Sequence, residues 1–183
     1  MSPVLPAPAS RDTWRQGTPT AASRSLVVTI GDFAVSNHAT DTIVTHALGS
    51  CIAVCLWDGV AGVGGILHFL LPESRINPAR AVAQPATFAD TGIPLLFETA
   101  ARLGLRKNRA TAKLVGGADS GLTGGGTFDV GKRNILAARS LLWKEGQLVG
   151  AESVGGTTAR TVRLMVGDGR LIVSSGRDVL VEL

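Results

Sequence analysis

The chain has 183 residues, a net charge of +4 and 45% hydrophobic residues, which fits one folded domain with a full core. Its lysines and arginines form no cluster along the chain, so the charge pattern does not predict nucleic-acid binding. With 23 glycines, no tyrosine and 4% aromatic residues, we expect a core of aliphatic side chains joined by many tight turns.

The sequence predicts a cytoplasmic protein that does not insert into a membrane. The uncharged segment 42–57 is shorter than the roughly 20 apolar residues of a transmembrane helix, and the N-terminus lacks the apolar stretch of a signal peptide. On one regular strand, Cys51 and Cys55 would have Cα atoms about 13 Å apart, beyond the ~7 Å limit for a disulfide. Free thiols are typical of a reducing compartment.

Residues 1–25 hold four of the eight prolines among Ala, Ser, Thr and Arg. Such a segment buries little apolar surface, so we expect a mobile extension. A single domain at 26–183 is expected to follow it.

The first half of this domain shows mainly strand patterns. Residues 73–87 are polar and contain Pro78 and Pro85, which predicts an irregular loop. Apolar and β-branched residues predict strands at 26–30, 42–44, 52–57 and 63–71.

Two helices are predicted from apolar residues that recur at spacings of four and three. The first covers 89–103 and ends at Gly104, although Pro94 fits a helix interior poorly and leaves its start open. The second covers 132–145 and ends at Gly146. We expect it to bury Ile135, Ala138 and Leu142.

Further strands are predicted at 112–115, 148–154, 161–166 and 171–174, with a glycine-rich loop through residue 126 and a hairpin turn at 168–169. Strands outnumber helices and come in consecutive groups. This pattern favours an α+β domain with mixed sheets over a doubly wound parallel fold.

Cys51 is the candidate nucleophile. A reactive thiol needs access and a lowered pKa, and Cys51 follows the Gly49-Ser50 turn at the mouth of a strand. We expect this turn to free the thiol from core packing and to point backbone N–H groups at a developing oxyanion. Cys55 lies deeper in the apolar run and is expected to be a small buried hydrophobe.

His68 is the candidate base, because it interrupts the apolar run 64–71, where an imidazole needs a polar partner. If its strand neighbours that of Cys51, a Cys–His pair could attack a carbonyl carbon. Taken alone, the residues favour a structural histidine that a backbone carbonyl satisfies. A third group should orient the imidazole, and the residues do not choose among Thr45, Asp41, Asp58 and Asp90.

Other chemistries are weaker alternatives. His46, Cys51, Cys55 and His68 are a conceivable zinc set, but their spacing matches no standard zinc motif. The glycines of 116–126 are followed by no Lys-Ser/Thr pair and do not predict a phosphate loop. Arg133 and Arg160 could bind a carboxylate, although solvated surface arginines are the simpler expectation.

The sequence motifs together resemble the chemoreceptor glutamine deamidase family, known as CheD. The resemblance runs from about residue 28 to residue 166. It is strongest at 45–56 (THALGSCIAVCL) and 64–72 (GGILHFLLP), and it continues at 88–91 (FADT), 113–118 (KLVGGA), 131–134 (GKRN) and 155–156 with Arg160. The sequence departs from the family at 46–47, where Leu-Gly is usual, and at Ser153, where an acidic residue is common.

The resemblance implies a function. In this family the positions of Cys51, His68 and Thr45 form the catalytic triad, Gly49 and Ser50 lie at the oxyanion and substrate, and neither metal nor cofactor is used. It implies a protein-glutamine glutaminase that converts receptor glutamines to glutamate and releases ammonia. It also implies a three-layer α/β/β sandwich like the catalytic domains of deamidating bacterial toxins.

The expected partners are methyl-accepting chemotaxis receptors, and a chemotaxis phosphatase is a candidate second partner because family members bind one. Two alternatives stay open at this point. One is a non-catalytic adaptor that docks on receptors or on the phosphatase, and the other is hydrolysis of receptor methyl esters by the same thiol.

Overall fold

The computed structural model describes residues 23–119 and 130–183. Within these ranges the chain forms ten strands and three α-helices, and the strands make two five-stranded sheets. Each sheet contains parallel and antiparallel neighbours, so the predicted α+β domain with mixed sheets is confirmed. Most of the expected N-terminal extension, and residues 120–126 of the expected glycine-rich loop, lie outside the described residues.

The first sheet has the order β1-β3-β8-β9-β10. Its strands are β1 (Ser25–Val28), β3 (Thr42–Leu48), β8 (Arg160–Met165), β9 (Leu171–Ser175) and β10 (Asp178–Glu182). The sequence did not predict β10, because its side chains are almost all exposed and a strand without a buried face leaves no alternating pattern.

The second sheet has the order β2-β5-β4-β6-β7. Its strands are β2 (Asp32–Ser36), β5 (Val63–Phe69), β4 (Ile52–Asp58), β6 (Thr111–Gly116) and β7 (Val149–Val154). The sequence did not predict β2, a short edge strand with mostly half-buried side chains. The central strands β4 and β5 are buried on both faces.

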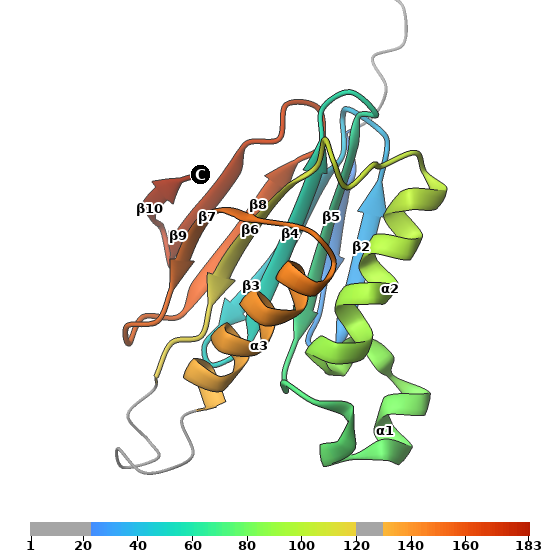
Figure 1. Cartoon of the computed structure of the whole chain (residues 1–183). Coiled ribbons are helices and arrows are strands. Elements are labelled where there is room, and N and C mark those ends of the chain that lie inside the picture. Colours follow the sequence, from blue (N-terminus) through green and yellow to red (C-terminus); the bar gives the residue numbers. More distant parts are fainter. Residues whose placement is uncertain (1–22, 120–129) are drawn as a thin grey trace, which may run out of the picture.

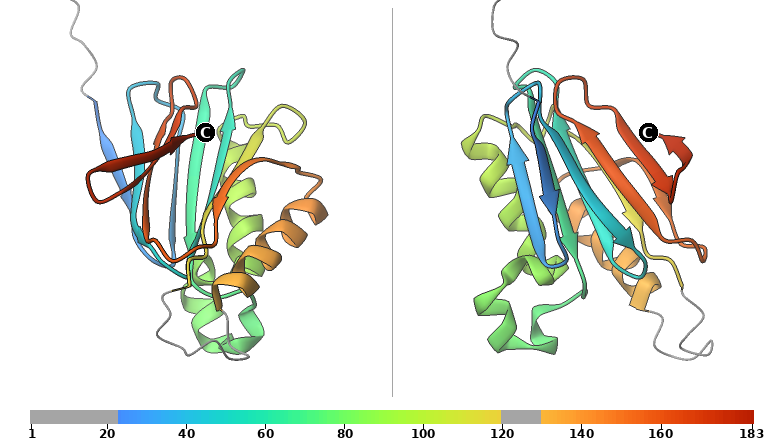
Figure 2. Two further views of the ribbon diagram at one scale, coloured as in Figure 1. Left: turned by 90° about the vertical axis from the view of Figure 1, so that its left-hand side faces the viewer. Right: turned by 180° about the vertical axis from the view of Figure 1, so that it is seen from behind.

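The helices α2 (Ala89–Arg102) and α3 (Val130–Lys144) cover one face of the second sheet, and the first sheet packs on its other face (Figures 1 and 2). Side chains alternate between the two faces of a strand. In β4, Ile52 and Val54 therefore pack toward the helices, whereas Ala53 and Cys55 pack toward the first sheet. This alternation decides which face of the sheet Cys51 joins.

The segment 73–87 is not the irregular loop that the sequence predicts. It forms the short helix α1 (Pro78–Ala83) between two 3₁₀ helices, Ser74–Ile76 and Pro85–Thr87. The side chain of Asn77 accepts a hydrogen bond from Arg80 N–H, and Pro78 occupies the first turn, where a missing N–H is harmless. Proline therefore starts these helices instead of preventing them.

The helix α2 begins at Ala89 even though it contains Pro94. Pro94 lies on the exposed face, while Ile93 and Leu96 are buried. Leu103 is 38% exposed and follows the last residue of the helix. The helix ends before Gly104, which has a φ of +102°. No helix in the described part of the chain is long and apolar enough to cross a membrane.

Candidate active site

Cys51 lies in the turn that joins β3 to β4, at the end of the molecule where α3 begins (Figure 1). Cys51 is 6% exposed, and its side chain packs in the core between the two sheets. The expectation that the turn frees Cys51 from core packing is therefore wrong. The reason is the alternation along β4, which puts residue 51 on the same face as Ala53 and Cys55, and the first sheet covers this face. Both cysteines are free thiols, as predicted.

His68 lies on β5, is fully buried, and shares the Cys51 face of the sheet. The register pairs His68 with Ala53, and Cys51 is two residues before Ala53. Cys51 and His68 are thus diagonal neighbours on one face, with Cβ atoms about 7 Å apart by the usual geometry of paired strands. The structure has no hydrogen bond between them, and His68 Nε2 is buried without a partner.

Thr45 contacts His68 across the interface between the sheets. Thr45 Oγ1 lies 2.7 Å from His68 Nδ1 and donates a hydrogen bond to Val28 O at 2.8 Å. A hydroxyl has one hydrogen, so Thr45 must accept from Nδ1–H. The imidazole proton is thereby assigned to Nδ1, which leaves a free lone pair on Nε2.

The protonation states follow from burial. Burial lowers the pKa of His68 to about 4, so the imidazole is neutral at pH 7. Burial also raises the pKa of the Cys51 thiol, although its own backbone N–H opposes that rise. Burial raises the pKa of Cys55 further, to about 12, against an opposing effect of Lys113. Cys51 and His68 are therefore both neutral in the resting site.

Other segments donate hydrogen bonds to the carbonyl groups of Gly49, Ser50 and Cys51 in the turn before β4. A trans peptide points its C=O and N–H in opposite directions, so the N–H groups of Ser50 and Cys51 point away from these donors. Neither N–H makes a hydrogen bond to another residue of the described chain. The carbonyl contacts are Ala118 N–H to Gly49 O at 2.8 Å, Asn134 Nδ2–H to Ser50 O at 2.9 Å and Gly117 N–H to Cys51 O at 2.8 Å.

The three aspartates considered as partners of His68 lie in other interactions. Asp41 binds Arg24 and Ser36. Asp58 binds Arg109, and Asp90 accepts hydrogen bonds from Ser74. Of the four candidates in the sequence, only Thr45 contacts the imidazole.

The conceivable zinc set does not assemble. His46 is exposed on β3, whereas both thiols are buried, and the described residues contain no group of three or more His, Cys, Asp or Glu that could hold a metal. Arg133 is exposed as expected. Arg160 is not a solvated surface arginine: it is half-buried, burial lowers its pKa, and its Nε is buried without a hydrogen-bond partner.

The sequence analysis included Asn134 in the motif 131–134 but assigned it no role. Asn134 is fully buried in α3, and its Nδ2 donates hydrogen bonds to the carbonyls of Ser50 and Leu70, each at 2.9 Å. A signal existed. Asn134 precedes Ala138 and Leu142 at spacings of four, which places a polar side chain on the buried face of an amphipathic helix.

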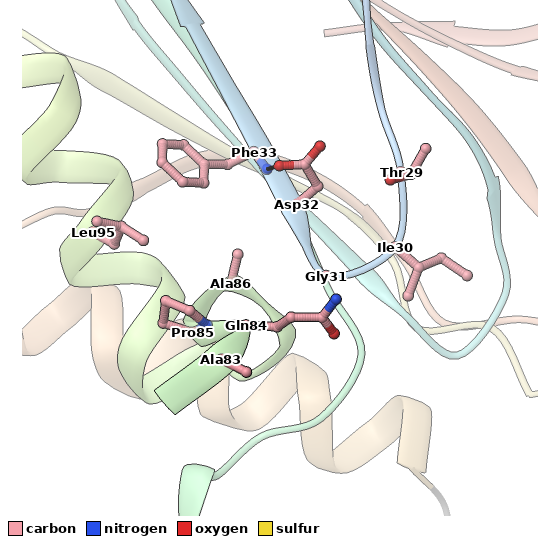
Figure 3. Close-up of a pocket in the computed structure, with 10 residues that line it drawn as sticks. All are labelled: Thr29, Ile30, Gly31, Asp32, Phe33, Ala83, Gln84, Pro85, Ala86 and Leu95. Atoms are coloured by element: carbon pink, nitrogen blue, oxygen red, sulfur yellow. Dashed lines mark hydrogen bonds between the residues drawn. The ribbon is translucent and has the colours of Figure 1, made fainter. Parts of the chain in front are cut away.

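A separate hollow of about 380 Å³ lies between the β1–β2 turn and the segment 83–86 that precedes α2 (Figure 3). It contains no thiol and no imidazole, and His68 adjoins it only through its backbone carbonyl, which accepts a hydrogen bond from Gly31 N–H. The candidate active site is therefore the Cys51 turn. The hollow is lined by Thr29, Ile30, Gly31, Asp32, Phe33, Ala83, Gln84, Pro85, Ala86 and Leu95.

Comparison with known proteins gives consistent relatives. A family model described as CheD chemotactic sensory transduction matches residues 70–175. A protein of Syntrophus aciditrophicus named "Probable chemoreceptor glutamine deamidase CheD 1" is 44% identical, over 86% of this chain and 98% of its own. A "Probable chemoreceptor glutamine deamidase CheD" of Solibacter usitatus is 47% identical over 80% of this chain and 86% of its own. A "CheD 2" protein of Anaeromyxobacter dehalogenans is 48% identical over 84% of this chain and 96% of its own.

These matches show the family: the chain belongs to the CheD family. A match over 86% of a 183-residue chain necessarily includes the segment 45–68, although the family model itself begins after it. Among solved structures, the Neisseria meningitidis protein NMB0706 is 14% identical, with a TM-score of 0.41 over 73% of this chain and 63% of its own.

Proposed function

We propose that this protein deamidates glutamine side chains of methyl-accepting chemotaxis receptors, with Cys51 as nucleophile, His68 as base and Thr45 as the group that orients the imidazole. The relatives are named as chemoreceptor glutamine deamidases. The observation that carries the proposal is the hydrogen bond between Thr45 and His68, because it leaves the Nε2 lone pair free on the face that His68 shares with Cys51. Residues 26–183 would form the catalytic domain.

In the first step, Cys51 Sγ attacks the carboxamide carbon of the glutamine side chain while its proton moves to His68 Nε2. The carbonyl oxygen becomes an oxyanion. The N–H groups of Ser50 and Cys51, which bond no other residue of the described chain, would donate to it. A side-chain atom added to Gly49 would meet no described residue within 4 Å, which leaves room for a substrate between the turn and the described part of the chain.

In the second step, His68 returns the proton to the departing nitrogen, the C–N bond breaks, and ammonia leaves a thioester on Cys51. His68 then takes a proton from water, and the hydroxide attacks the thioester carbon. The C–S bond breaks, the thiol regains its proton and glutamate is released. These steps need only the side chains and backbone described above, and they involve neither metal nor cofactor.

The resting site would be a neutral pair and not a preformed ion pair, since burial lowers the pKa of His68 to about 4 and raises the pKa of Cys51. Sγ–H must therefore lose its proton as the attack proceeds. Desolvation raises the energy of a thiolate, so the turn's N–H groups matter more here than they would in a solvated site. We expect kcat to rise with pH until the thiol ionises.

The proposed substrate implies an effect on the receptor and the compartment in which the reaction takes place. The product carries a new negative charge on a receptor helix, which changes helix packing through charge repulsion and creates a site that can be methylated. Two free thiols suit the reducing cytoplasm, where this reaction would take place. A chemotaxis phosphatase is a proposed second partner.

Mass spectrometry of candidate receptors tests the proposal. Receptors incubated with wild-type protein should show Gln-to-Glu conversion, and Cys51→Ala should reduce ammonia release by at least ~10³-fold, as loss of a catalytic nucleophile does. Cys55→Ala is the matched control, because it removes a thiol on the same strand face and should keep the activity. Undiminished conversion by Cys51→Ala would overturn the mechanism. Receptor binding by the wild type without any conversion would point instead to an adaptor, and loss of methyl groups to an esterase.

A further inference from the structure

We infer that Asn134 is a positioning residue for the Cys51 turn: its side-chain amide holds the Ser50–Cys51 peptide so that the Cys51 N–H faces the developing oxyanion. This inference rests on the proposed deamidation. It adds a residue of α3 to a site whose proposed catalytic groups all come from β3, β5 and the turn between β3 and β4.

The contacts of Asn134 are specific. Its side chain is fully buried, and Nδ2 donates to Ser50 O and to Leu70 O, both at 2.9 Å. Because both neighbours are carbonyl acceptors, only the amide nitrogen can face them. Oδ1 consequently points elsewhere and is buried without a hydrogen-bond partner. An unpaired buried acceptor is unfavourable, so the two hydrogen bonds of Nδ2 have to offset that cost.

Close packing brings α3 within reach of the turn. A Cβ at Gly131, in the first turn of α3, would lie 2.7 Å from Gly117 O, and a Cβ at Gly117 would lie 2.6 Å from the side chain of Ile135. Only glycines fit this approach. Gly117 N–H in turn holds Cys51 O at 2.8 Å. Asn134 of α3 and Gly117, which follows β6, thus donate hydrogen bonds to two successive carbonyls of the turn that contains Cys51.

The consequence for the reaction follows from the geometry of one peptide. Ser50 C=O and Cys51 N–H belong to the same trans unit and point in opposite directions, so fixing the oxygen on α3 fixes the N–H on the far side. There the N–H lies against Cys51 Sγ, where it lowers the thiol's pKa. A hydrogen bond to the carbonyl also polarises the peptide and strengthens its N–H as a donor.

The second hydrogen bond of Asn134 joins the nucleophile to the base. Leu70 is two residues after His68, so one amide group ties the turn before β4 to the end of β5. These two segments carry the atoms that must exchange a proton. Asn134 would therefore fix the Cys51 N–H and also the separation between Sγ and Nε2.

Gln147 is a matched control within the same chain. Its buried side-chain amide donates to the carbonyls of Ala110 at 2.9 Å and Leu148 at 3.4 Å, and its Oε1 is also buried without a partner. It has the chemistry of Asn134 but touches a different part of the fold. A purely structural role predicts the same behaviour for both residues.

The experiment compares Asn134→Ala, Asn134→Leu and Gln147→Ala with the wild type; leucine has a similar branched shape and protects folding. Kinetics of ammonia release from receptor, thermal unfolding and the pH profile of Cys51 alkylation by iodoacetamide are measured on each full-length protein. Alkylation requires the thiolate but forms no oxyanion. We expect both Asn134 variants to lose about 100-fold in kcat with KM unchanged. The alkylation profile should shift only slightly toward higher pH, because a less fixed Cys51 N–H lowers the thiol's pKa less. Gln147→Ala should lose thermal stability only.

The outcomes separate this inference from the proposed function. An Asn134→Leu variant that is folded and as active as the wild type would overturn the inference alone, as would a kcat loss no greater than that of Gln147→Ala. An alkylation rate that falls in parallel with kcat would also overturn it, since Asn134 would then act on the thiol. A wild-type protein that alkylates normally but releases no ammonia from any receptor would overturn the proposed function.

Discussion

The two ends of β4 bury polar groups in opposite ways. At the Asp58 end, the carboxylate accepts hydrogen bonds from the N–H groups of Val60, Ala61 and Arg106 and pairs with Arg109. Burial alone would raise the pKa of Asp58, but these hydrogen bonds lower it to about 2. At the Cys51 end, His68 Nε2 and Asn134 Oδ1 are buried without partners.

Hydrogen-bond satisfaction distinguishes the two ends of β4 better than pKa shifts do. Both ends of β4 contain a group with a strongly shifted pKa, and such shifts occur at structural ion pairs as well as at active sites. The difference lies in hydrogen-bond satisfaction. A satisfied buried carboxylate stabilises the fold, whereas each unpaired buried group costs about 1–3 kcal/mol.

The largest expected effect is at the satisfied end. Asp58→Ala should lower the free energy of unfolding by about 4 kcal/mol, because it leaves the Arg109 guanidinium and three backbone N–H groups without their acceptor. Urea denaturation measures this loss, with the exposed Asp178→Ala as control. Deamidation per folded molecule should not change. Lost activity in a folded Asp58→Ala protein would remove the distinction between the two ends.

The next effect is a difference in pH dependence. The pKa of His68 is lowered from 6.5 to about 4. Between these two values the unfolded state binds a proton at His68 that the folded state does not bind, so the free energy of unfolding decreases as pH falls. This group should cost the wild type about 3 kcal/mol between pH 6.5 and pH 4, at ~1.4 kcal/mol per pKa unit. The lowered pKa of Asp58 changes stability in the same direction but in a lower pH window: its stabilisation is complete above about pH 4 and is lost as pH falls toward pH 2.

Denaturation curves of wild type and His68→Gln between pH 7 and pH 3 check this expectation. The stability difference between the two proteins should change between pH 6.5 and pH 4 and stay constant below pH 4. A constant difference throughout would mean that His68 is not kept neutral by burial.

A smaller effect is expected where the two sheets meet. Thr45→Val keeps the shape of the side chain but leaves Val28 O and His68 Nδ1–H unpaired, so it should cost about 2 kcal/mol of stability. It should also lower kcat roughly 100-fold, because nothing then holds the imidazole in the reactive tautomer. Thermal unfolding and ammonia release measure the two effects. Stability loss with full kcat would make Thr45 a structural residue.

The smallest expected effect is a gain in stability. Ala47 is the non-glycine residue with positive φ, +56°, in the described chain, and it lies in the irregular register between Thr45 and Leu48. A left-handed conformation costs a residue with a Cβ about 1 kcal/mol. Ala47→Gly should therefore raise the free energy of unfolding by up to about 1 kcal/mol, as chemical denaturation would show. Destabilisation would mean that the Ala47 methyl group has a packing role.

The sequence predicted most of the regular elements, because burial imposes period-two and helical patterns that a linear chain displays. The strands that contain Ile52 and Val63 and the helix that buries Ala138 follow from these patterns. The short helix at Pro78 and the exposed strand at Val179 were missed, since the first depends on a side-chain cap and the second has no buried face.

For the candidate site, the sequence by itself determined the chemistry available: two thiols that cannot pair, an imidazole in an apolar run, and a glycine turn before Cys51. Only the tertiary structure decided which group partners His68, since Thr45 and His68 belong to different sheets and meet because those sheets pack face to face. It also decided that Cys51 is buried and that Asn134 reaches the turn from α3. These contacts join residues that are 23 and 84 positions apart in the sequence. They depend on how the layers stack, and a linear pattern of side chains does not encode that stacking.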